Sequence, residues 1–319
     1  MIIGSHVNFK NDGLLGSVKQ ALSYNSTTFM FYTGAPQNTI RKDIDIDITN
    51  KAHDLMKQNN IDINNIICHA PYIINLANKA KIDSWHFSIS FLKQEIKRCE
   101  MLGVKYIVLH PGSAVTHTKE EAINNIIDGL NEVIDENTTV TILLETMAGK
   151  GTEVGSTMED IKKIIDNIIY QNKIGVCLDT CHLNDSGIDI SKFDDYLDEF
   201  DTQIGLKKVK CIHINDSLNP LSSHKDRHAN IGFGTIGFDN LINVIYNEKL
   251  KDVPKILETP YIEEYPPYKF EIESILEKRF NPSLKEDVID YYKNLWYLEK
   301  YSIYTFFIFS KLPFWNLSS

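Results

Sequence analysis

Short apolar runs recur along the chain and are separated by longer stretches with helical spacing. Eight of these runs are rich in β-branched residues and predict strands, at residues 2–7, 28–32, 66–69, 106–110, 142–145, 175–179, 211–213 and 256–258. Apolar residues at a period of 3.6 predict helices from Leu14 to Leu22 and from Ser84 to Met101, the latter ending at Gly103. Thr118 and Thr157 are predicted to begin two further helices. Strands that alternate with helices indicate a parallel sheet.

Six consecutive predicted strands end on a residue that can bind a metal. These residues are His69, His110, Glu145, Asp179, His213 and Glu258, spaced 41, 35, 34, 34 and 45 residues apart. Each interval is about the length of a strand, a helix and two loops, and a (β/α)8 barrel gathers its C-terminal strand ends at one mouth. One histidine in an apolar strand is more often an ordinary core residue. Six such strand ends in a row are improbable as accidents, so we predict a barrel with a metal site at that mouth.

Three more candidate ligands lie just beyond strand ends. His182 follows Asp179 by three residues and is expected in the first turn of the following loop. Asp226 and His228 would point the same way if that segment is extended. The resulting nine candidates are enough for three metal ions with some sharing, and His, Asp and Glu are what a multi-zinc site needs.

Length and composition agree with this prediction. A chain of 319 residues could hold one large α/β barrel or two ordinary domains, and 43% hydrophobic with 24% charged residues is typical of a soluble globular protein. We find no signal peptide at the N-terminus and no apolar run of roughly 20 residues, and so expect no membrane span. The five cysteines favour buried, reduced thiols in a cytoplasmic protein. An open doubly wound sheet is the alternative fold, but no Gly-x-Gly-x-x-Gly follows the first strand.

The net charge of −10 does not decide the partner. Taken alone it argues against nucleic acid. Four of the counted carboxylates are candidate ligands, however, and three divalent ions would bring −10 to −4 by adding six positive charges at the barrel mouth. A locally electropositive site for a phosphate is therefore compatible with an acidic chain.

Three motifs of the chain together resemble the endonuclease IV family of apurinic/apyrimidinic endonucleases. They are Leu178-Asp179-Thr180-Cys181-His182, Asp226-Arg227-His228-Ala229-Asn230-Ile231-Gly232-x-Gly234-x-Ile236-Gly237 and Leu257-Glu258-Thr259-Pro260. The resemblance covers about residues 1–283, and the joint occurrence of the motifs is highly specific. It implies a (β/α)8 barrel with three zinc ions that cuts double-stranded DNA on the 5′ side of an abasic site and leaves a 3′-hydroxyl.

The resemblance also implies how the ligands divide among the ions. One zinc would be held by His69, His110 and Glu145, and a second by Glu145, Asp179, His213 and Glu258. The third would be held by His182, Asp226 and His228. Neighbouring ions can neutralise a phosphodiester and activate water, so no separate nucleophile is required. Glu145 is the expected catalytic residue, because it would bridge two ions and position the nucleophile.

Candidate DNA contacts come from loops. Tyr72 and Ile73 match the wedge that the family inserts into DNA, with loop packing as the alternative. Gln37 lies where some family members carry an arginine, and it could fill space and hydrogen-bond without charge. Arg227, between two ligands, either braces its loop or touches the DNA backbone.

Residues 284–319 form an aromatic-rich extension beyond the resemblance. Residues 288–298 suit an amphipathic helix, whereas 303–309 are too few to span a bilayer. Packing on the barrel, disorder, and a partner or membrane-surface contact through Trp315 and its aromatic neighbours all remain open. We expect a monomer.

Two other functions compete with the nuclease. Sugar isomerases and epimerases with the same barrel use a set resembling Glu145, Asp179, His213 and Glu258 with one or two ions, but would not need the remaining candidate ligands. A lesion-binding protein without catalysis would be expected to have a broken ligand set, and this set is complete. Counting bound metals would separate the nuclease from the isomerase: three tightly bound zinc ions favour the nuclease, and one or two ions favour the isomerase.

Overall fold

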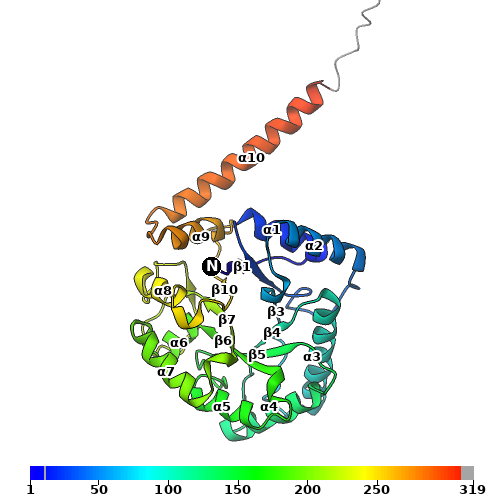
Figure 1. The fold of residues 1–319 in the computed structure, drawn as a ribbon, viewed down its shortest axis with the longest axis vertical. Helices are drawn as coiled ribbons and strands as arrows, with labels where there is room; N and C mark the ends of the chain where they lie inside the picture. The colour runs from blue at the N-terminus through cyan, green and yellow to red at the C-terminus, as the bar shows by residue number, and fades with distance from the viewer. Residues whose placement is uncertain (11, 310–319) are drawn as a thin grey trace, which may run out of the picture.

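The computed structural model describes residues 1–10 and 12–309, with side chains up to Trp296. Eight parallel strands close into a barrel in the order β1-β10-β7-β6-β5-β4-β3-β2, and helices surround it (Figure 1). The barrel strands are β1 (Ile3–His6), β2 (Thr28–Phe31), β3 (Ile67–His69), β4 (Tyr106–Leu109), β5 (Thr141–Glu145), β6 (Ile174–Asp179), β7 (Val209–Ile214) and β10 (Lys255–Leu257). The predicted (β/α)8 barrel is therefore confirmed, and the open sheet is excluded.

Ten α-helices and a small ribbon complete the described chain. The helices are α1 (Gly13–Ser23), α2 (Ile46–Gln58), α3 (Ile82–Leu102), α4 (Lys119–Val133), α5 (Met158–Asp166), α6 (Thr180–Ser186), α7 (Phe193–Gln203), α8 (Phe238–Ile245), α9 (Tyr268–Glu277) and α10 (Leu284–Phe309). Short 3₁₀ helices cover Ile63–Asn65, Gln171–Lys173, Ile190–Lys192, Leu206–Lys208 and Glu248–Leu250. Strands β8 (Asp216–Ser217) and β9 (His228–Ala229) pair antiparallel.

Local sequence signals fix where several helices begin and end. The Thr118 hydroxyl accepts the Glu121 N–H, and the Glu121 carboxylate accepts the Thr118 N–H, which together form a capping box for α4. The Thr157 hydroxyl caps α5 by accepting the Asp160 N–H. Helix α3 ends at Gly103, whose φ of 75° is left-handed, a conformation that glycine adopts without strain.

A separate buried cluster of apolar side chains lies inside the barrel. Met30, Ile67, Val108, Leu143, Cys177, Cys211 and Ile256 form this buried cluster, one from each of seven strands. The larger core cluster packs the outer faces of the strands against the helices. Because strand side chains alternate between faces, the residue two positions beyond each interior residue also points inward, but at the C-terminal mouth.

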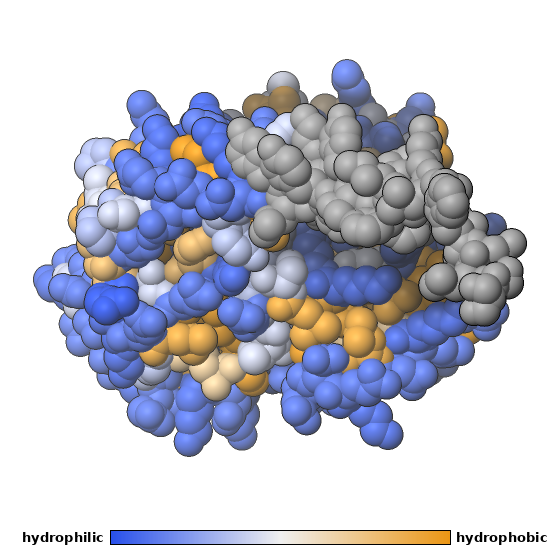
Figure 2. Space-filling model, turned by 90° about the horizontal axis from the view of Figure 1, so that it is seen from above, coloured by the Kyte–Doolittle hydropathy of each residue, from blue (hydrophilic) through white to orange (hydrophobic). Residues whose placement is uncertain are grey.

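Helix α10 begins by packing on the rest of the chain and then extends away from it (Figure 1). Leu284 and Val288 are buried with Ile262, next to Tyr265 and Tyr292, whose stacked rings have centroids 5.1 Å apart. The face from which α10 projects is largely hydrophilic, with a few apolar patches (Figure 2). The side chains of 303–309, together with Trp315, lie outside the described residues. Within the described part of the chain, no helix is long and apolar enough to cross a membrane.

Closure of the barrel between β1 and β2 requires glycine at position 4. A Cβ atom at Gly4 would lie 1.8 Å from the backbone oxygen of Thr28 on the neighbouring strand. We therefore expect Gly4→Ala to lower the free energy of unfolding by more than about 3 kcal/mol, because a backbone contact cannot relax as a side chain can. Urea unfolding followed by circular dichroism measures this loss.

Gly16→Ala is the matched control. Gly16 lies in α1, and the nearest atom to an added Cβ would be the Asp12 Cβ at 3.1 Å. Alanine favours helix, so this variant should unfold at nearly the wild-type urea concentration or above it. A Gly4→Ala protein as stable as Gly16→Ala would contradict the account of barrel closure.

Candidate metal centre

The structure brings all nine candidate ligands together at the C-terminal mouth of the barrel. Six of them follow an interior core residue by two positions, as in Ile67 and His69 or Leu143 and Glu145. Three groups of ligand atoms result, each with its atoms within 4.8 Å of one another: His69, His110 and Glu145; Glu145, Asp179, His213 and Glu258; and His182, Asp226 and His228. These are the three sets that the family resemblance implies.

Glu145 lies at the centre of the cluster. Its Oε2 is 3.2 Å from Nε2 of His69 and 3.0 Å from Nε2 of His110. Its Oε1 is 3.1 Å from Nδ1 of His213 and 3.4 Å from Nδ1 of His182. The two oxygens of one carboxylate therefore face different groups of donors, which is the arrangement of a bridging ligand.

Backbone carbonyls hold three of the imidazoles in one orientation. Nδ1 of His69 lies 2.7 Å from the carbonyl oxygen of Ala70, and Nδ1 of His182 lies 2.9 Å from that of Thr146. Nδ1 of His228 lies 3.2 Å from the carbonyl oxygen of Glu258. When Nδ1–H donates to these carbonyls, the Nε2 lone pair is directed into the cluster. The buried Nε2 of His228 has no hydrogen-bond partner within the described residues, so a metal ion would satisfy it.

Asp179 has two structural roles in addition to its place in the cluster. As the last residue of β6 it caps α6, where its Oδ1 accepts the His182 N–H. Its Oδ2 accepts a hydrogen bond of 2.8 Å from Nδ2 of Asn215, and Oδ1 of Asn215 in turn accepts the Glu258 N–H. Asn215 therefore orients two candidate ligands at once.

Two local expectations from sequence were wrong. His182 lies in the first turn of helix α6, not in a loop, because Asp179 caps that helix. Asp226 is not extended but left-handed, with a φ of 55°, and its N–H donates to the buried carboxylate of Asp185. It still meets its group, since its Oδ1 lies 3.1 Å from Nε2 of His182 and 3.6 Å from Nε2 of His228.

Sequence reasoning missed several residues that support the site. Asn215 follows His213 by two residues, and this period-two spacing was a usable signal. His6 is the last residue of β1 and so repeats the strand-end pattern; its ring lies 5.1 Å from that of Tyr32, which lies 5.0 Å from that of His69. Asp185 gave no such signal, because its buried contacts with Ser217 and Asp226 form only on folding.

The cluster is closed on the barrel side and open on the other. His69, Glu145, Asp179, His182 and His213 are buried. The side chains of His110 and Asp226 are 31% and 29% exposed. A substrate could therefore approach along the His110 and Asp226 side without unfolding the barrel.

Charges within the cluster shift the pKa values of its members. Burial alone would raise the pKa of Glu145, but His213 and His110 outweigh it and hold that pKa well below its usual range. Burial alone would lower the pKa of His110, yet the Glu145 carboxylate raises it. The pKa values of His182 and His213 are also raised against burial, the former mainly by Asp179. The Glu145 carboxylate thus remains ionised, as a metal ligand must be.

The candidate DNA contacts lie on loops around this mouth. Tyr72 is 52% exposed, whereas Ile73 is half-buried and packs against the main core. Gln37 and Arg227 are exposed. Arg227 is tied to its loop through its backbone carbonyl, which accepts the Leu218 N–H.

The arginine next to the Gln37 loop points inward. Arg41 pairs with buried Glu95 at 2.6 Å and donates to the carbonyls of Ala35, Asn38 and Ile40. It therefore fixes the shape of the loop and leaves Gln37 at its surface.

Comparison with known proteins agrees with this geometry. Residues 18–278 match the Xylose isomerase-like TIM barrel family. "Probable endonuclease 4" of Mesoplasma florum is 51% identical over 289 residues, covering 89% of this chain and 99% of that protein. A protein of the same name from Staphylococcus aureus is 48% identical over 297 residues, covering 91% and 99%.

Solved structures extend the likeness. The crystal structure of endonuclease IV from Thermus thermophilus matches with a TM-score of 0.74 and 27% identity, covering 87% of this chain and all of that one. A D-tagatose 3-epimerase-like protein matches with a TM-score of 0.63 at 18% identity, which shows a shared fold.

The raised histidine pKa values predict how metal affinity depends on pH. Because their pKa values are raised, His110, His182 and His213 keep a proton at pH values where an ordinary histidine has lost it. Each proton must leave before the nitrogen that carries it can bind a metal. Affinity should therefore rise with pH from about 6 to 8, by more than about tenfold for each pH unit. Competition titrations with a zinc-binding dye at pH 6, 7 and 8 measure it. An affinity independent of pH in this window would contradict the proton linkage.

Proposed function

This chain belongs to the endonuclease IV family and is a DNA-cleaving hydrolase, and we propose that it cuts the phosphodiester 5′ to an abasic site in duplex DNA, leaving a 3′-hydroxyl. The observation that carries the proposal is the convergence of three ligand groups around one mouth, two of them sharing Glu145. The role that follows is base excision repair.

We propose three Zn²⁺ ions as the cofactors. The donors are imidazole nitrogens and carboxylate oxygens in groups of three and four, which is what zinc prefers. Bound zinc would supply positive charge for the phosphate and lower the pKa of water towards neutrality. The nine residues would divide as the three groups do.

The protein orients the metal-binding side chains and keeps the Glu145 carboxylate ionised. Glu145, held ionised by the surrounding imidazoles, offers one oxygen to the His69 and His110 side and one to the His213 side. Fixed carbonyl partners keep His69, His182 and His228 from rotating. Donors held this rigidly need little rearrangement during the reaction. We assign Glu145 as the catalytic residue.

The group of His182, Asp226 and His228 favours the nuclease over a sugar isomerase. An isomerase would need only the set around Glu145, Asp179, His213 and Glu258. The third group also has its ligand atoms within 4.8 Å of one another, and Nε2 of His228 is unsatisfied within the described residues, as expected for a ligand. We therefore do not adopt the isomerase alternative.

Recognition of DNA is assigned to the loops of the mouth. Tyr72 is the best candidate to enter the duplex, because it is aromatic, exposed and only three residues beyond His69. Gln37 and Arg227 are exposed and free to meet the strand backbone from neighbouring loops. Ile73 serves mainly to anchor the loop, since it packs on the core.

Residues 1–283 would form the nuclease domain, and 284–319 an extension to which we give no role. We propose a cytoplasmic monomer that acts on double-stranded DNA.

Cleavage of a defined duplex tests the function. A labelled duplex with one abasic site should be nicked on the 5′ side, with an end that DNA polymerase extends directly. Because the ligands hold zinc through several protein groups, nicking should persist without added Mg²⁺ and disappear after prolonged chelation. An uncut abasic duplex, or equal cleavage by protein shown to be metal-free, would refute the mechanism. A duplex with an intact base is the control.

Glu145→Gln separates chemistry from binding. The amide keeps the shape of the side chain but removes the charge, so the nicking rate should fall by at least about a hundredfold, the scale of losing one electrostatic contribution to catalysis. Affinity for abasic DNA should change much less. Zinc content must be measured alongside, because the variant also weakens metal retention. Cleavage near the wild-type rate would place Glu145 outside the reaction.

Tyr72→Ala tests recognition. Loss of an aromatic contact with unstacked bases should weaken binding to an abasic duplex by about 1–3 kcal/mol. The melting temperature and zinc content should stay near wild type, since the ring is exposed. Ile73→Ala is the matched control: it should lower stability more and binding less, because its side chain packs on the core. The reverse pattern would move the wedge to Ile73.

A further inference from the structure

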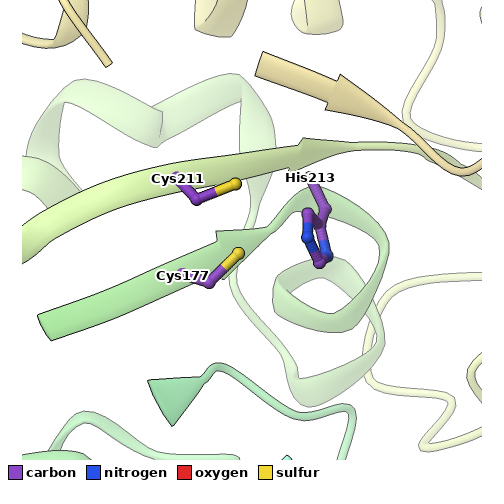
Figure 3. A group of neighbouring side chains, drawn as sticks. All are labelled: Cys177, Cys211 and His213. Carbon is purple, nitrogen blue, oxygen red and sulfur yellow. The ribbon is translucent and has the colours of Figure 1, made fainter. Parts of the chain in front are cut away.

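Two cysteines and a histidine form a cluster inside the barrel that the proposed hydrolysis does not use as a unit. Cys177 of β6 and Cys211 of β7 are direct partners in the parallel pairing of these strands. His213 follows Cys211 by two residues and so shares its inward face. Figure 3 shows both thiols side by side with the His213 ring next to them.

The spacing of the three side chains suits a shared metal ion. One ligand atom from each residue lies within 4.8 Å of the others, and the thiols are free. Two sulfurs bound at about 2.3 Å to one three-coordinate ion lie about 4 Å apart. The sulfur atoms of Cys177 and Cys211, within 4.8 Å of each other, would have to approach by at most about 0.8 Å to close around an ion.

Only one of the two imidazole nitrogens of His213 faces the carboxylates of the candidate zinc centre. Nδ1 faces the upper carboxylates, 3.1 Å from Glu145 and 3.0 Å from Glu258. The side chain is fully buried, and Nε2 has no hydrogen-bond partner within the described residues. A buried ring nitrogen without a partner is costly, so Nε2 is the atom available to a further ligand.

The surroundings of the thiols select the kind of ion. Leu143, Ile256 and the other residues of this buried cluster are apolar, so two thiols and one imidazole are the metal-binding groups that the described residues gather here. Closed zinc sites are almost always four-coordinate, whereas Cu⁺ accepts three ligands and is favoured by thiolates. We propose that Cys177, Cys211 and Nε2 of His213 form a site for one Cu⁺ ion beneath the candidate zinc centre.

This site and the zinc centre draw on the same imidazole. Without zinc, Nδ1–H of His213 can donate to Glu145 and Glu258, and Nε2 binds Cu⁺ once its own proton has left. When Nδ1 binds zinc, Nε2 retains the proton, and Cu⁺ must displace it. Each metal should therefore weaken the other by the same factor, as linkage requires.

Copper binding to the full chain tests the proposal without reference to DNA cleavage. Chelated protein titrated with Cu⁺ under anaerobic conditions should bind one ion through Cys177 and Cys211, with thiolate charge-transfer absorption. X-ray absorption at the copper edge should show two sulfurs and one nitrogen. Prior addition of zinc should lower the Cu⁺ affinity. No uptake, a shell without this composition, or an affinity unaffected by zinc would overturn the proposal.

Paired cysteine variants locate the ion. Cys211→Ala should lose the Cu⁺ equivalent that gives the mixed sulfur and nitrogen shell. Cys99→Ala is the matched control, because Cys68 and Cys99 are also buried and adjacent but have no histidine grouped with them. It should keep that equivalent. The opposite result would place copper at Cys68 and Cys99. The absorption spectrum of the wild-type chain decides the question if Cys211→Ala fails to fold.

Discussion

A buried carboxylate is stable only where opposite charge or hydrogen bonds replace its lost water, and at Glu145 imidazoles supply them from several directions. Only 1% of this residue is exposed, yet its pKa is held well below the usual range by His213 and His110. Removal of any one of these partners would leave a charge that the barrel cannot hydrate. The mouth is therefore a mutually dependent assembly rather than a set of separate ligands.

The barrel makes this assembly possible through the alternation of its strands. Each inward side chain at the mouth lies two residues beyond one that fills the interior, so the packing of Ile67, Leu143 or Cys211 fixes the height of the ligand above it. The register between paired strands then determines which ligand side chains lie next to each other, as Asp179 of β6 and His213 of β7 do. Precision in the site follows from packing in the core, which also explains why the thiols of β6 and β7 come to lie directly below His213.

The barrel strands and most candidate ligands could be predicted from sequence, because each such ligand is the inward side chain at the C-terminal end of an apolar strand. The apolar runs that end in His69, His110 or Glu145 identify both a strand and the position of its last side chain. The rule fails where tertiary contacts decide the backbone. Asp226 reaches its group through a left-handed conformation held by Asp185, and no pattern within 221–228 indicates that contact. The inward turn of Arg41 likewise depends on Glu95, which lies 54 residues away.

We propose that nine residues hold three zinc ions in three defined groups. Anomalous diffraction measured on both sides of the zinc absorption edge, from crystals of the zinc-loaded protein, tests it most directly. The account predicts three peaks: one among His69, His110 and Glu145, one among Glu145, Asp179, His213 and Glu258, and one among His182, Asp226 and His228. A map with one or two peaks, and none beside His228 in fully loaded protein, would contradict it.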